Sequence, residues 1–219
     1  MTASALPFHE RVTLNGPAGD LEARIETPQG LERVTAFGVI CHPHPLFGGT
    51  LDNKVVYSLA RAFHDLGLAT IRFNFRGVGK SAGSFADGIG ETEDALAVVA
   101  AGREKWPDAA LWLGGFSFGG AVAIRAASQA SPARLVTVAP AIRRVPLDGV
   151  AMPTCPWLIV QGDQDDLVNH TEVIDWASKL PQPPEIALIP GVEHFFHGKL
   201  NELRDVVTSF ATSAEKIVS

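Results

Sequence analysis

The sequence predicts an α/β fold: a mostly parallel sheet of about eight strands with an antiparallel N-terminal edge, helices on both faces and no cap domain. Short apolar, β-branched runs alternate along the chain with longer segments whose apolar residues recur at helical spacing. Strands that alternate with helices form βαβ units, which give a parallel sheet covered on both faces. With 219 residues, 46% of them hydrophobic, the chain is expected to form one domain over residues 1–219.

Local signals place the individual elements. The glycine- and proline-containing segment 15–19 separates two short alternating runs and predicts a hairpin, which forms the antiparallel edge. The run VTAFGVIC at 34–41 is too short for a typical helix and is expected to be a buried strand. Gly67 and Pro107 end two segments of helical spacing. The expected strands cover residues 11–14, 21–26, 34–41, 69–75, 111–116, 135–139, 157–161 and 185–189. The expected helices cover residues 51–66, 91–105, 118–130, 171–180 and 199–218, and residues 77–90 form a loop.

The segment GGFSFGG at residues 114–120 contains the pattern G-x-S-x-G between a predicted strand and a predicted helix. A serine on so tight a turn is held in a strained backbone conformation with its hydroxyl exposed. Gly115 and Gly119 are small enough for the strand and the helix to pass close to each other there. The turn also places Ser117 at a helix N-terminus, where free N–H groups favour negative charge. We interpret Ser117 as a nucleophile; the alternative is a glycine-rich packing turn with an incidental serine.

A serine nucleophile needs a base, and the base needs an acid that orients it. Ligands of parallel sheets bind beyond the carboxyl ends of the strands, so these partners should follow strands. The segment GDQDD at residues 162–166 follows one predicted strand, and spacing does not choose among its three aspartates, Asp163, Asp165 and Asp166.

The base is expected to follow the last predicted strand, where the segment PGVEH ends at His194. Two other histidines come after the aspartates in the chain. His170 is expected to open a helix and His197 leads into the last one, so His194 is preferred.

The chain order of serine, aspartate and histidine, each after a strand, resembles the α/β-hydrolase superfamily over nearly the whole length. The segment CHPHPLFGG at residues 41–49 is similar to the C-H-P-H-P-L-x-G-G loop of small bacterial members. More distantly, the chain is similar to dienelactone hydrolases and acyl-protein thioesterases. These families place the acid in a G-x-x-D turn, which implies Asp165, and their histidine follows a glycine after the last strand, which implies His194. Dienelactone hydrolases have a cysteine where this chain has Ser117, so their specific reaction is not implied.

The resemblance also implies an oxyanion hole made by backbone N–H groups. One donor is the residue after the nucleophile, Phe118. The other lies in the loop after the third strand, where Pro43 and Pro45 have no N–H and leave His44 or Leu46. The similarity of residues 46–48 to the corresponding loop of dienelactone hydrolases favours Leu46.

Two other motifs carry alternative interpretations. His42 and His44 are spaced like metal ligands on a strand, but no third ligand lies nearby in the sequence, so no metal is expected. The segment RGVGKS at residues 76–81 ends like a phosphate-binding loop, but Asn74 stands where that motif needs glycine. The segment resembles the R-G-x-G-x-S turn of α/β-hydrolases, which is architectural, and no cofactor is expected.

These residues predict a carboxylesterase-like serine hydrolase. Ser117, His194 and Asp165 would cleave small or exposed carboxylic esters or thioesters through an acyl-enzyme. The connection over residues 140–156 is too short for a multi-helix cap, which predicts an open site and disfavours long triglycerides as substrates. The alternatives are a peptidase and a non-catalytic binding module with the same fold.

Composition narrows the expected partners and location. A net charge of −6 gives no basic face for nucleic acid. The N-terminal residues MTASALPFHERV lack a signal pattern, and the apolar run at 95–101 is far shorter than a membrane helix. Cys41 and Cys155 cannot build a disulfide framework. We expect a cytoplasmic protein that binds a small-molecule substrate and neither nucleic acid nor membrane; its oligomeric state is open.

Overall fold

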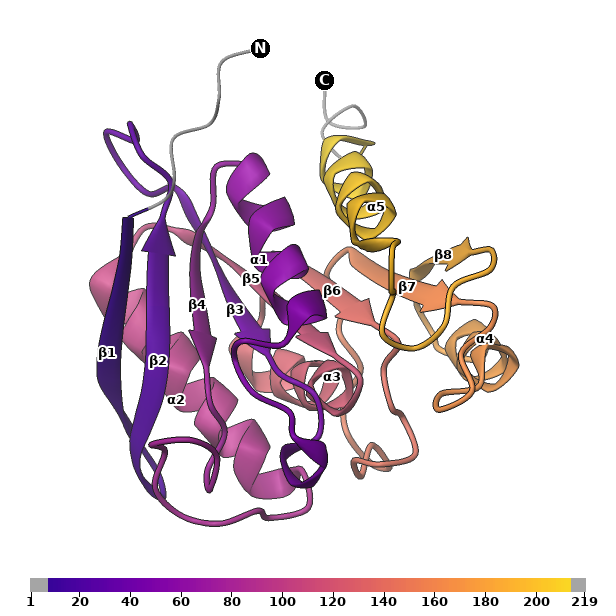
Figure 1. The fold of residues 1–219 in the computed structure, drawn as a ribbon, viewed down its shortest axis with the longest axis horizontal. Helices are drawn as coiled ribbons and strands as arrows, with labels where there is room; N and C mark the ends of the chain where they lie inside the picture. Colours follow the sequence, from indigo (N-terminus) through magenta and orange to yellow (C-terminus); the bar gives the residue numbers. More distant parts are fainter. Residues whose placement is uncertain (1–7, 214–219) are drawn as a thin grey trace.

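The computed structural model describes residues 8–213, which form an eight-stranded sheet with helices on both faces (Figure 1). The strand order is β1-β2-β4-β3-β5-β6-β7-β8. The strands are β1 (Phe8–Gly16), β2 (Gly19–Thr27), β3 (Ala36–Cys41), β4 (Ala69–Phe73), β5 (Ala110–Phe116), β6 (Arg134–Val138), β7 (Trp157–Gly162) and β8 (Glu185–Ile189). The helices are α1 (Lys54–Asp65), α2 (Ile89–Lys105), α3 (Phe118–Ala130), α4 (His170–Ser178) and α5 (Leu200–Ser213), and a short 3-10 helix, η1, covers Pro45–Phe47.

The sheet has the predicted mixed character. The hairpin of β1 and β2 pairs in antiparallel register up to Gly16 and Gly19, and β2 then pairs antiparallel with β4. The six strands from β4 to β8 pair in parallel. Because parallel strands end at the same edge of a sheet, the segments that follow β3, β5, β7 and β8 meet there. The fold predicted from the sequence is confirmed.

Two apolar cores lie on the two faces of the sheet. Val39 and Cys41 of β3 face the core that α2, α3 and α4 cover, and Ile40 between them faces the core under α1 and α5. This alternation is what a strand buried on both faces requires, and it explains why the strand sequences are continuously apolar. Figure 1 shows α1 beside α5 on one face and α2 beside α3 on the other, which agrees with the packing of these helix pairs.

Several predicted boundaries shift by a few residues, each for a local reason. The helix expected over 51–66 begins at Lys54, because the side chain of Asn53 accepts hydrogen bonds from the first N–H groups of α1. The strand expected over 69–75 ends at Phe73, after which the Asn74 N–H donates to the Glu22 carbonyl. The last predicted helix, 199–218, is observed as α5, and its final part falls outside the described residues.

The connection from β6 to β7, residues 139–156, contains turns and no helix. The fold therefore carries no helical cap over the carboxyl edge at this point, as the length of the segment predicted. Among residues 8–213, none of the helices has the length and apolar character needed to cross a bilayer.

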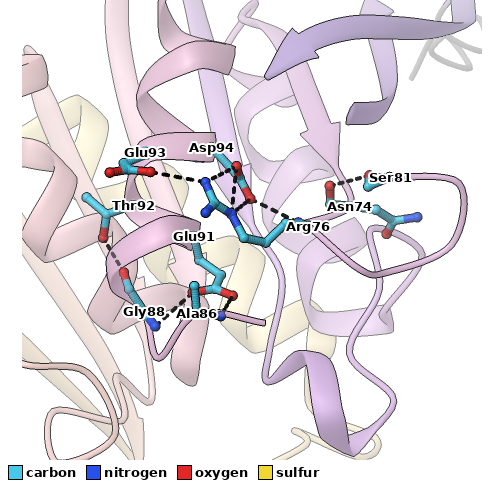
Figure 2. A network of polar contacts seen from close by, with 9 residues as sticks. All are labelled: Asn74, Arg76, Ser81, Ala86, Gly88, Glu91, Thr92, Glu93 and Asp94. Atoms are coloured by element: carbon cyan, nitrogen blue, oxygen red, sulfur yellow. Dashed lines mark hydrogen bonds and ion pairs between the residues drawn. The ribbon is translucent and has the colours of Figure 1, made fainter. Parts of the chain in front are cut away.

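The turn after β4 is anchored by a buried polar network, which Figure 2 shows in close-up. The Arg76 guanidinium forms a two-pronged ion pair with Asp94 of α2 and reaches Glu93 as well. Glu91 accepts hydrogen bonds from the N–H groups of Ala86 and Gly88 and so closes the far end of the loop. The loop of residues 77–90 is therefore fixed at both ends to the start of α2.

Several polar groups of residues 76–81 are already engaged within the protein. The Lys80 N–H donates to Glu22, and the Ser81 hydroxyl donates to the Asn74 carbonyl. The Ser81 N–H donates to the carbonyl of Val78. The segment is thus an architectural turn, in keeping with its resemblance to the R-G-x-G-x-S turn and not with a phosphate cradle.

Candidate active site

Ser117 lies on the sharp turn between β5 and α3, in a backbone conformation that side chains rarely adopt (φ 55°, ψ −118°). The turn is possible because the two flanking glycines let backbones touch. A Cβ on Gly115 would lie 2.2 Å from the carbonyl oxygen of Gly119, and a Cβ on Gly119 would lie 2.3 Å from that of His42. The Ser117 N–H donates to the Val138 carbonyl, which fixes the strained residue to the end of β6.

His194, five residues after β8, places its Nε2 atom 3.0 Å from the Ser117 Oγ. The imidazole is buried and packs against two aromatic rings, those of Phe116 and Phe195, at centroid distances of 4.9 and 5.1 Å. These contacts leave the ring little freedom to turn away from the serine. Nε2 is therefore within hydrogen-bond distance of the hydroxyl, the geometry that a general base requires.

Asp165, three residues after β7, lies on the other side of the imidazole. Its Oδ2 atom is 2.7 Å from His194 Nδ1 and also accepts a hydrogen bond from the side chain of Gln161. Its Oδ1 atom accepts the N–H groups of Leu167 and Val168. Both carboxylate oxygens are thus satisfied in a buried position, and a carboxylate can only accept at Nδ1. The proton of a neutral His194 then lies on Nδ1, and Nε2 is free to accept the serine proton.

The structure separates Asp165 from the two neighbouring aspartates that spacing left as candidates. Asp163 accepts a hydrogen bond from the Gly191 N–H and so holds the loop after β8, and Asp166 is exposed. His170 is the first residue of α4, and the exposed His197 pairs with Glu193. The geometry therefore brings together Ser117, His194 and Asp165, the three side chains predicted from the sequence and the family resemblance.

The two expected oxyanion donors differ in their surroundings. Phe118 is the first residue of α3, where a backbone N–H has no acceptor within the helix. The Leu46 N–H, in contrast, donates to Nδ1 of His44 over 3.2 Å, and the Leu46 side chain is 66% exposed. His44 lines the cavity in front of Ser117, and Leu46 does not. The geometry thus favours His44, the alternative that the prolines left open, over the predicted Leu46.

His42 holds the start of this loop in place through both of its ring nitrogens. Nε2 accepts the Phe75 N–H over 3.0 Å, and Nδ1 lies 2.6 Å from the Pro43 carbonyl, to which it can only donate. The ring is therefore neutral, and burial lowers its pKa to about 4. With both nitrogens engaged, His42 is a structural tether and not a metal ligand.

The ring of His44 packs among aromatic side chains from three segments, Phe47, Phe85 and Phe118. Phe85 belongs to the loop that the Arg76–Asp94 ion pair and Glu91 anchor (Figure 2). Desolvation, with the positive charge of Arg144 as a second cause, lowers the pKa of His44 below its ordinary value. The neutral ring keeps Nδ1 available to accept the Leu46 N–H, so the loop conformation depends on an uncharged His44.

A cavity of about 500 Å³ opens in front of these groups. Ser117 and His194 line it from the triad side, and Pro43, His44 and Phe47 line it from the loop side. A larger cavity, of about 1050 Å³, lies beside α4 and the segment after β6 and contains none of the three triad side chains. The smaller cavity is the candidate active site because Ser117 and His194 both line it.

The sequence analysis missed two residues at this site. Gln161 donates from Nε2 to both Asp165 Oδ2 and the Val168 carbonyl, and so positions the acidic turn. A polar residue at the end of an otherwise apolar strand is the signal that could have identified it. Arg144 lines the cavity from the connection after β6, and no local pattern in the sequence marks it.

Comparison with known proteins agrees with this fold. Residues 48–154 match the family model described as "Serine aminopeptidase, S33". The crystal structure of XC6422 from Xanthomonas campestris, described as an α/β serine hydrolase without lid, is 39% identical, with a TM-score of 0.89 and 95% of each chain covered. An α/β serine hydrolase homologue from Coxiella burnetii is 44% identical, with a TM-score of 0.87 over 91% of this chain and 96% of that one. The uncharacterized protein RP471 of Rickettsia prowazekii is 30% identical over 210 residues, which are 91% of this chain and 87% of that protein.

A mostly parallel sheet with a serine on its strand–turn–helix elbow defines the class of α/β hydrolases. The chain belongs to the α/β-hydrolase superfamily, and its relatives of 39 and 44% identity are described as an α/β serine hydrolase and an α/β serine hydrolase homologue. Residues 139–156 form no helical lid over the site, and XC6422 is likewise described as lacking a lid. The family and these relatives support hydrolase activity.

Proposed function

We propose that the protein is a serine hydrolase that cleaves small or exposed carboxylic esters or thioesters through an acyl-enzyme. One observation carries the proposal: the continuous chain from Ser117 Oγ to His194 Nε2, 3.0 Å, and from His194 Nδ1 to Asp165 Oδ2, 2.7 Å. A hydroxyl next to a base that a buried carboxylate orients is the arrangement that activates a serine.

The chemistry begins when Ser117 Oγ attacks the substrate carbonyl and His194 Nε2 takes its proton. Asp165 holds the imidazole in the correct tautomer and stabilises the imidazolium that forms. The imidazolium then protonates the leaving alcohol or thiol, which leaves an acyl group on Ser117. In the second half a water molecule attacks the acyl carbonyl while His194 Nε2 takes its proton. The bond between the acyl carbon and Ser117 Oγ then breaks, the imidazolium returns the proton to Oγ, and the carboxylic acid leaves.

The oxyanion that forms in both steps needs backbone donors. Phe118 supplies one, because its N–H lies at the start of α3 and the helix dipole favours negative charge there. We assign the second donor to the His44 N–H and not to that of Leu46, which is bonded to the His44 ring. His44 also lines the cavity into which the nucleophile opens.

The cavity supports small or exposed acyl groups. The β6–β7 connection places no helix over it, and several apolar side chains at its edge are exposed: Phe47, Leu167 and Phe195. Such a site binds a short acyl chain against apolar walls without enclosing a long one.

A peptidase is the second candidate, because the matching family model is described as a serine aminopeptidase. An aminopeptidase must hold the ammonium group of a peptide N-terminus, for which a carboxylate is the natural partner. Among the described residues that line the cavity none is Asp or Glu, and Arg144 adds a positive charge. This argues for an ester or thioester and against an N-terminal peptide. A non-catalytic binding module is disfavoured because it has no need of a complete triad.

The test is a panel of short p-nitrophenyl esters, acyl thioesters and aminoacyl anilides, measured with the wild-type protein and with Ser117→Ala. If Ser117 is the nucleophile, the substitution lowers kcat by on the order of 10³–10⁶-fold. Circular dichroism of the variant controls for folding. A fluorophosphonate probe should label the wild-type serine and leave Ser117→Ala unlabelled. Near-normal turnover by the variant would contradict the mechanism, and hydrolysis of the anilides alone would favour the peptidase.

A further inference from the structure

Arg144 brings a positive charge to the cavity in front of Ser117. Its side chain is exposed and lines the same cavity as Ser117 and His194. Within residues 8–213, no hydrogen bond or ion pair engages its guanidinium group. The neighbouring Arg143, in contrast, is paired with Glu172 over 2.8 Å and does not line this cavity. The two adjacent arginines thus differ: Arg143 forms an ion pair outside the cavity of Ser117, and Arg144, which forms none within residues 8–213, lines that cavity.

The backbone of Arg144 is tied to the nucleophile by two hydrogen bonds in succession. The Ala141 N–H donates to the Ser117 carbonyl over 3.0 Å, and the Arg144 N–H donates to the Ala141 carbonyl over 2.8 Å. On the far side, the Arg125 guanidinium of α3 holds the Pro146 carbonyl over 2.6 Å. The short turn that carries Arg144 is therefore fixed relative to Ser117, so the guanidinium samples a limited volume at the edge of the site.

The charge of Arg144 reaches His44: after burial, it is the second cause that lowers the pKa of this histidine, against the opposite effects of Glu91 and Asp87. Four acidic side chains, Asp87, Asp148, Glu172 and Asp175, line the larger neighbouring cavity, which Arg144 also borders. None of the four lines the cavity of Ser117. Arg144 is thus the only Asp, Glu, Lys or Arg side chain among the described residues that line the cavity of Ser117, so an anionic group of a substrate would meet a cation and no carboxylate there.

We propose that Arg144 binds a carboxylate of the substrate, so that the preferred substrates are esters or thioesters whose acyl part ends in an anionic group, as in monoesters of dicarboxylic acids. The guanidinium presents several N–H donors in one plane and can pair with a carboxylate through two of them. The apolar walls contributed by Phe47, Leu167 and Phe195 would contact the methylene groups between the scissile carbonyl and the carboxylate. This assignment rests on the proposed function and specifies its substrate class.

The test compares two esters that differ only at the end of a six-carbon acyl chain: mono-p-nitrophenyl adipate, which ends in a carboxylate, and p-nitrophenyl hexanoate, which ends in a methyl group. The measured quantity is the ratio of their kcat/KM values. Arg144→Gln should lower this ratio about tenfold, the size expected for the loss of a hydrogen bond to a charged group. The loss should appear as a higher KM for the adipate ester. Arg144→Lys should retain part of the preference, and Arg143→Gln, the matched control, should leave the ratio within about twofold.

Two further measurements test the proposal: the salt dependence of kcat/KM and the direct binding of adipate. Raising the NaCl concentration should lower kcat/KM for the adipate ester more than for the hexanoate ester in the wild type, and equally for both in Arg144→Gln. Binding of free adipate to Ser117→Ala, followed by ligand-observed NMR, needs no turnover. It should be lost in Ser117→Ala/Arg144→Gln.

The outcomes distinguish the two proposals. If neither ester is hydrolysed but adipate binds through Arg144, the hydrolase proposal fails and the anion site stands. If both esters are hydrolysed and Arg144→Gln changes them by the same factor, the anion site is overturned and Arg144 only balances the acidic residues of the neighbouring cavity. Adipate binding that survives Arg144→Gln would overturn it as well.

Discussion

Ser117, Asp165 and His194 each follow a strand of the parallel sheet, whereas the loop of residues 42–49, which lines the same cavity, depends on side chains for its conformation. The triad side chains converge because β5, β7 and β8 end at one edge. The loop is held by the two ring nitrogens of His42 and by the ring of His44, which accepts the Leu46 N–H.

The two sides of the cavity are therefore positioned in different ways, one by the topology of the sheet and the other by hydrogen bonds of side chains. The triad side, formed by Ser117, Asp165 and His194, is positioned by the sheet topology and by close backbone contact at the elbow. The loop side is positioned by imidazole groups that must be neutral, and it is therefore open to protonation. We expect substitutions on the triad side to abolish chemistry, and substitutions in the loop to change oxyanion stabilisation or pH dependence.

The largest effect is expected for Asp165→Asn. An amide at this position donates to Nδ1 and forces the wrong tautomer of His194, which should lower kcat by on the order of 10³–10⁴-fold. Asp163→Asn is the matched control, because Asp163 accepts only from the Gly191 N–H of the neighbouring loop. It should keep kcat within about threefold and cost on the order of 1 kcal/mol of stability. Equal losses of kcat in the two variants would remove Asp165 from the triad.

The next largest effect is expected for Gly119→Ala, because Gly119 is where the elbow of Ser117 packs against the backbone of Cys41 and His42. The new Cβ would lie 2.3 Å from the His42 carbonyl oxygen and 2.4 Å from that of Cys41, and neither backbone can move without shifting β3 or α3. We expect the free energy of unfolding in urea to fall by about 3–4 kcal/mol. Gly120→Ala is the control, since its Cβ meets nothing closer than 3.2 Å and should cost clearly less. If the two variants are equally stable, the elbow is not limited by backbone contact.

The sequence predicted the triad side well because its signals are local and steric. G-x-S-x-G specifies a turn by the sizes of its residues, and the position of Asp165 and His194 after strands follows from the sheet topology. Among the aspartates, spacing alone did not choose; the family resemblance pointed to Asp165, and the hydrogen bonds to Gln161, Leu167 and Val168 explain why only this carboxylate faces the imidazole.

The sequence predicted the loop side only in part, because its conformation depends on contacts between distant segments. Prolines excluded two of the candidate donors, but the bond from the Leu46 N–H to the His44 ring is a matter of side-chain orientation that spacing does not specify. The same holds for His42, whose partner Phe75 lies 33 residues away. Arg144 reaches the cavity through turns that carry no sequence pattern, so no sequence argument could place it there.

A backbone substitution decides between the two candidate oxyanion donors. Replacing the peptide N–H of residue 44 by an ester oxygen, through semisynthesis with the α-hydroxy acid, should lower kcat by on the order of 10²–10³-fold, about 3 kcal/mol, with little change in KM. The same replacement at residue 46 removes only the bond to the His44 ring and should lower stability by about 1 kcal/mol with kcat nearly unchanged. The reverse pattern would restore Leu46 as the donor.

The last prediction concerns the loop alone and has no effect at neutral pH: protonation of His42 at lower pH should decrease the free energy of unfolding. The pKa of His42 is lowered from the ordinary 6.5 to about 4 in the folded protein. Between pH 6.5 and 4 the His42 side chain therefore binds a proton in the unfolded chain but not in the folded one. The contribution of the neutral His42 ring to the free energy of unfolding is therefore fully present above about pH 6.5 and is lost as the pH falls towards 4. The loss amounts to about 3 kcal/mol.

The measurement is the free energy of unfolding in urea at several pH values between 4 and 8. His42→Gln is less stable at pH 8, because it loses the paired bonds to Phe75 and Pro43, but it should lack this part of the decline and approach the wild type at pH 4. His197→Gln is the control, since that side chain is 74% exposed and should leave the wild-type slope unchanged. If wild type and His42→Gln lose stability in parallel, His42 is not the titrating tether, and the contrast between a triad side positioned by topology and a loop positioned by a neutral imidazole fails. A fall in kcat of the folded wild type over the same pH range does not test this point, because His194 must also be neutral to act as the base.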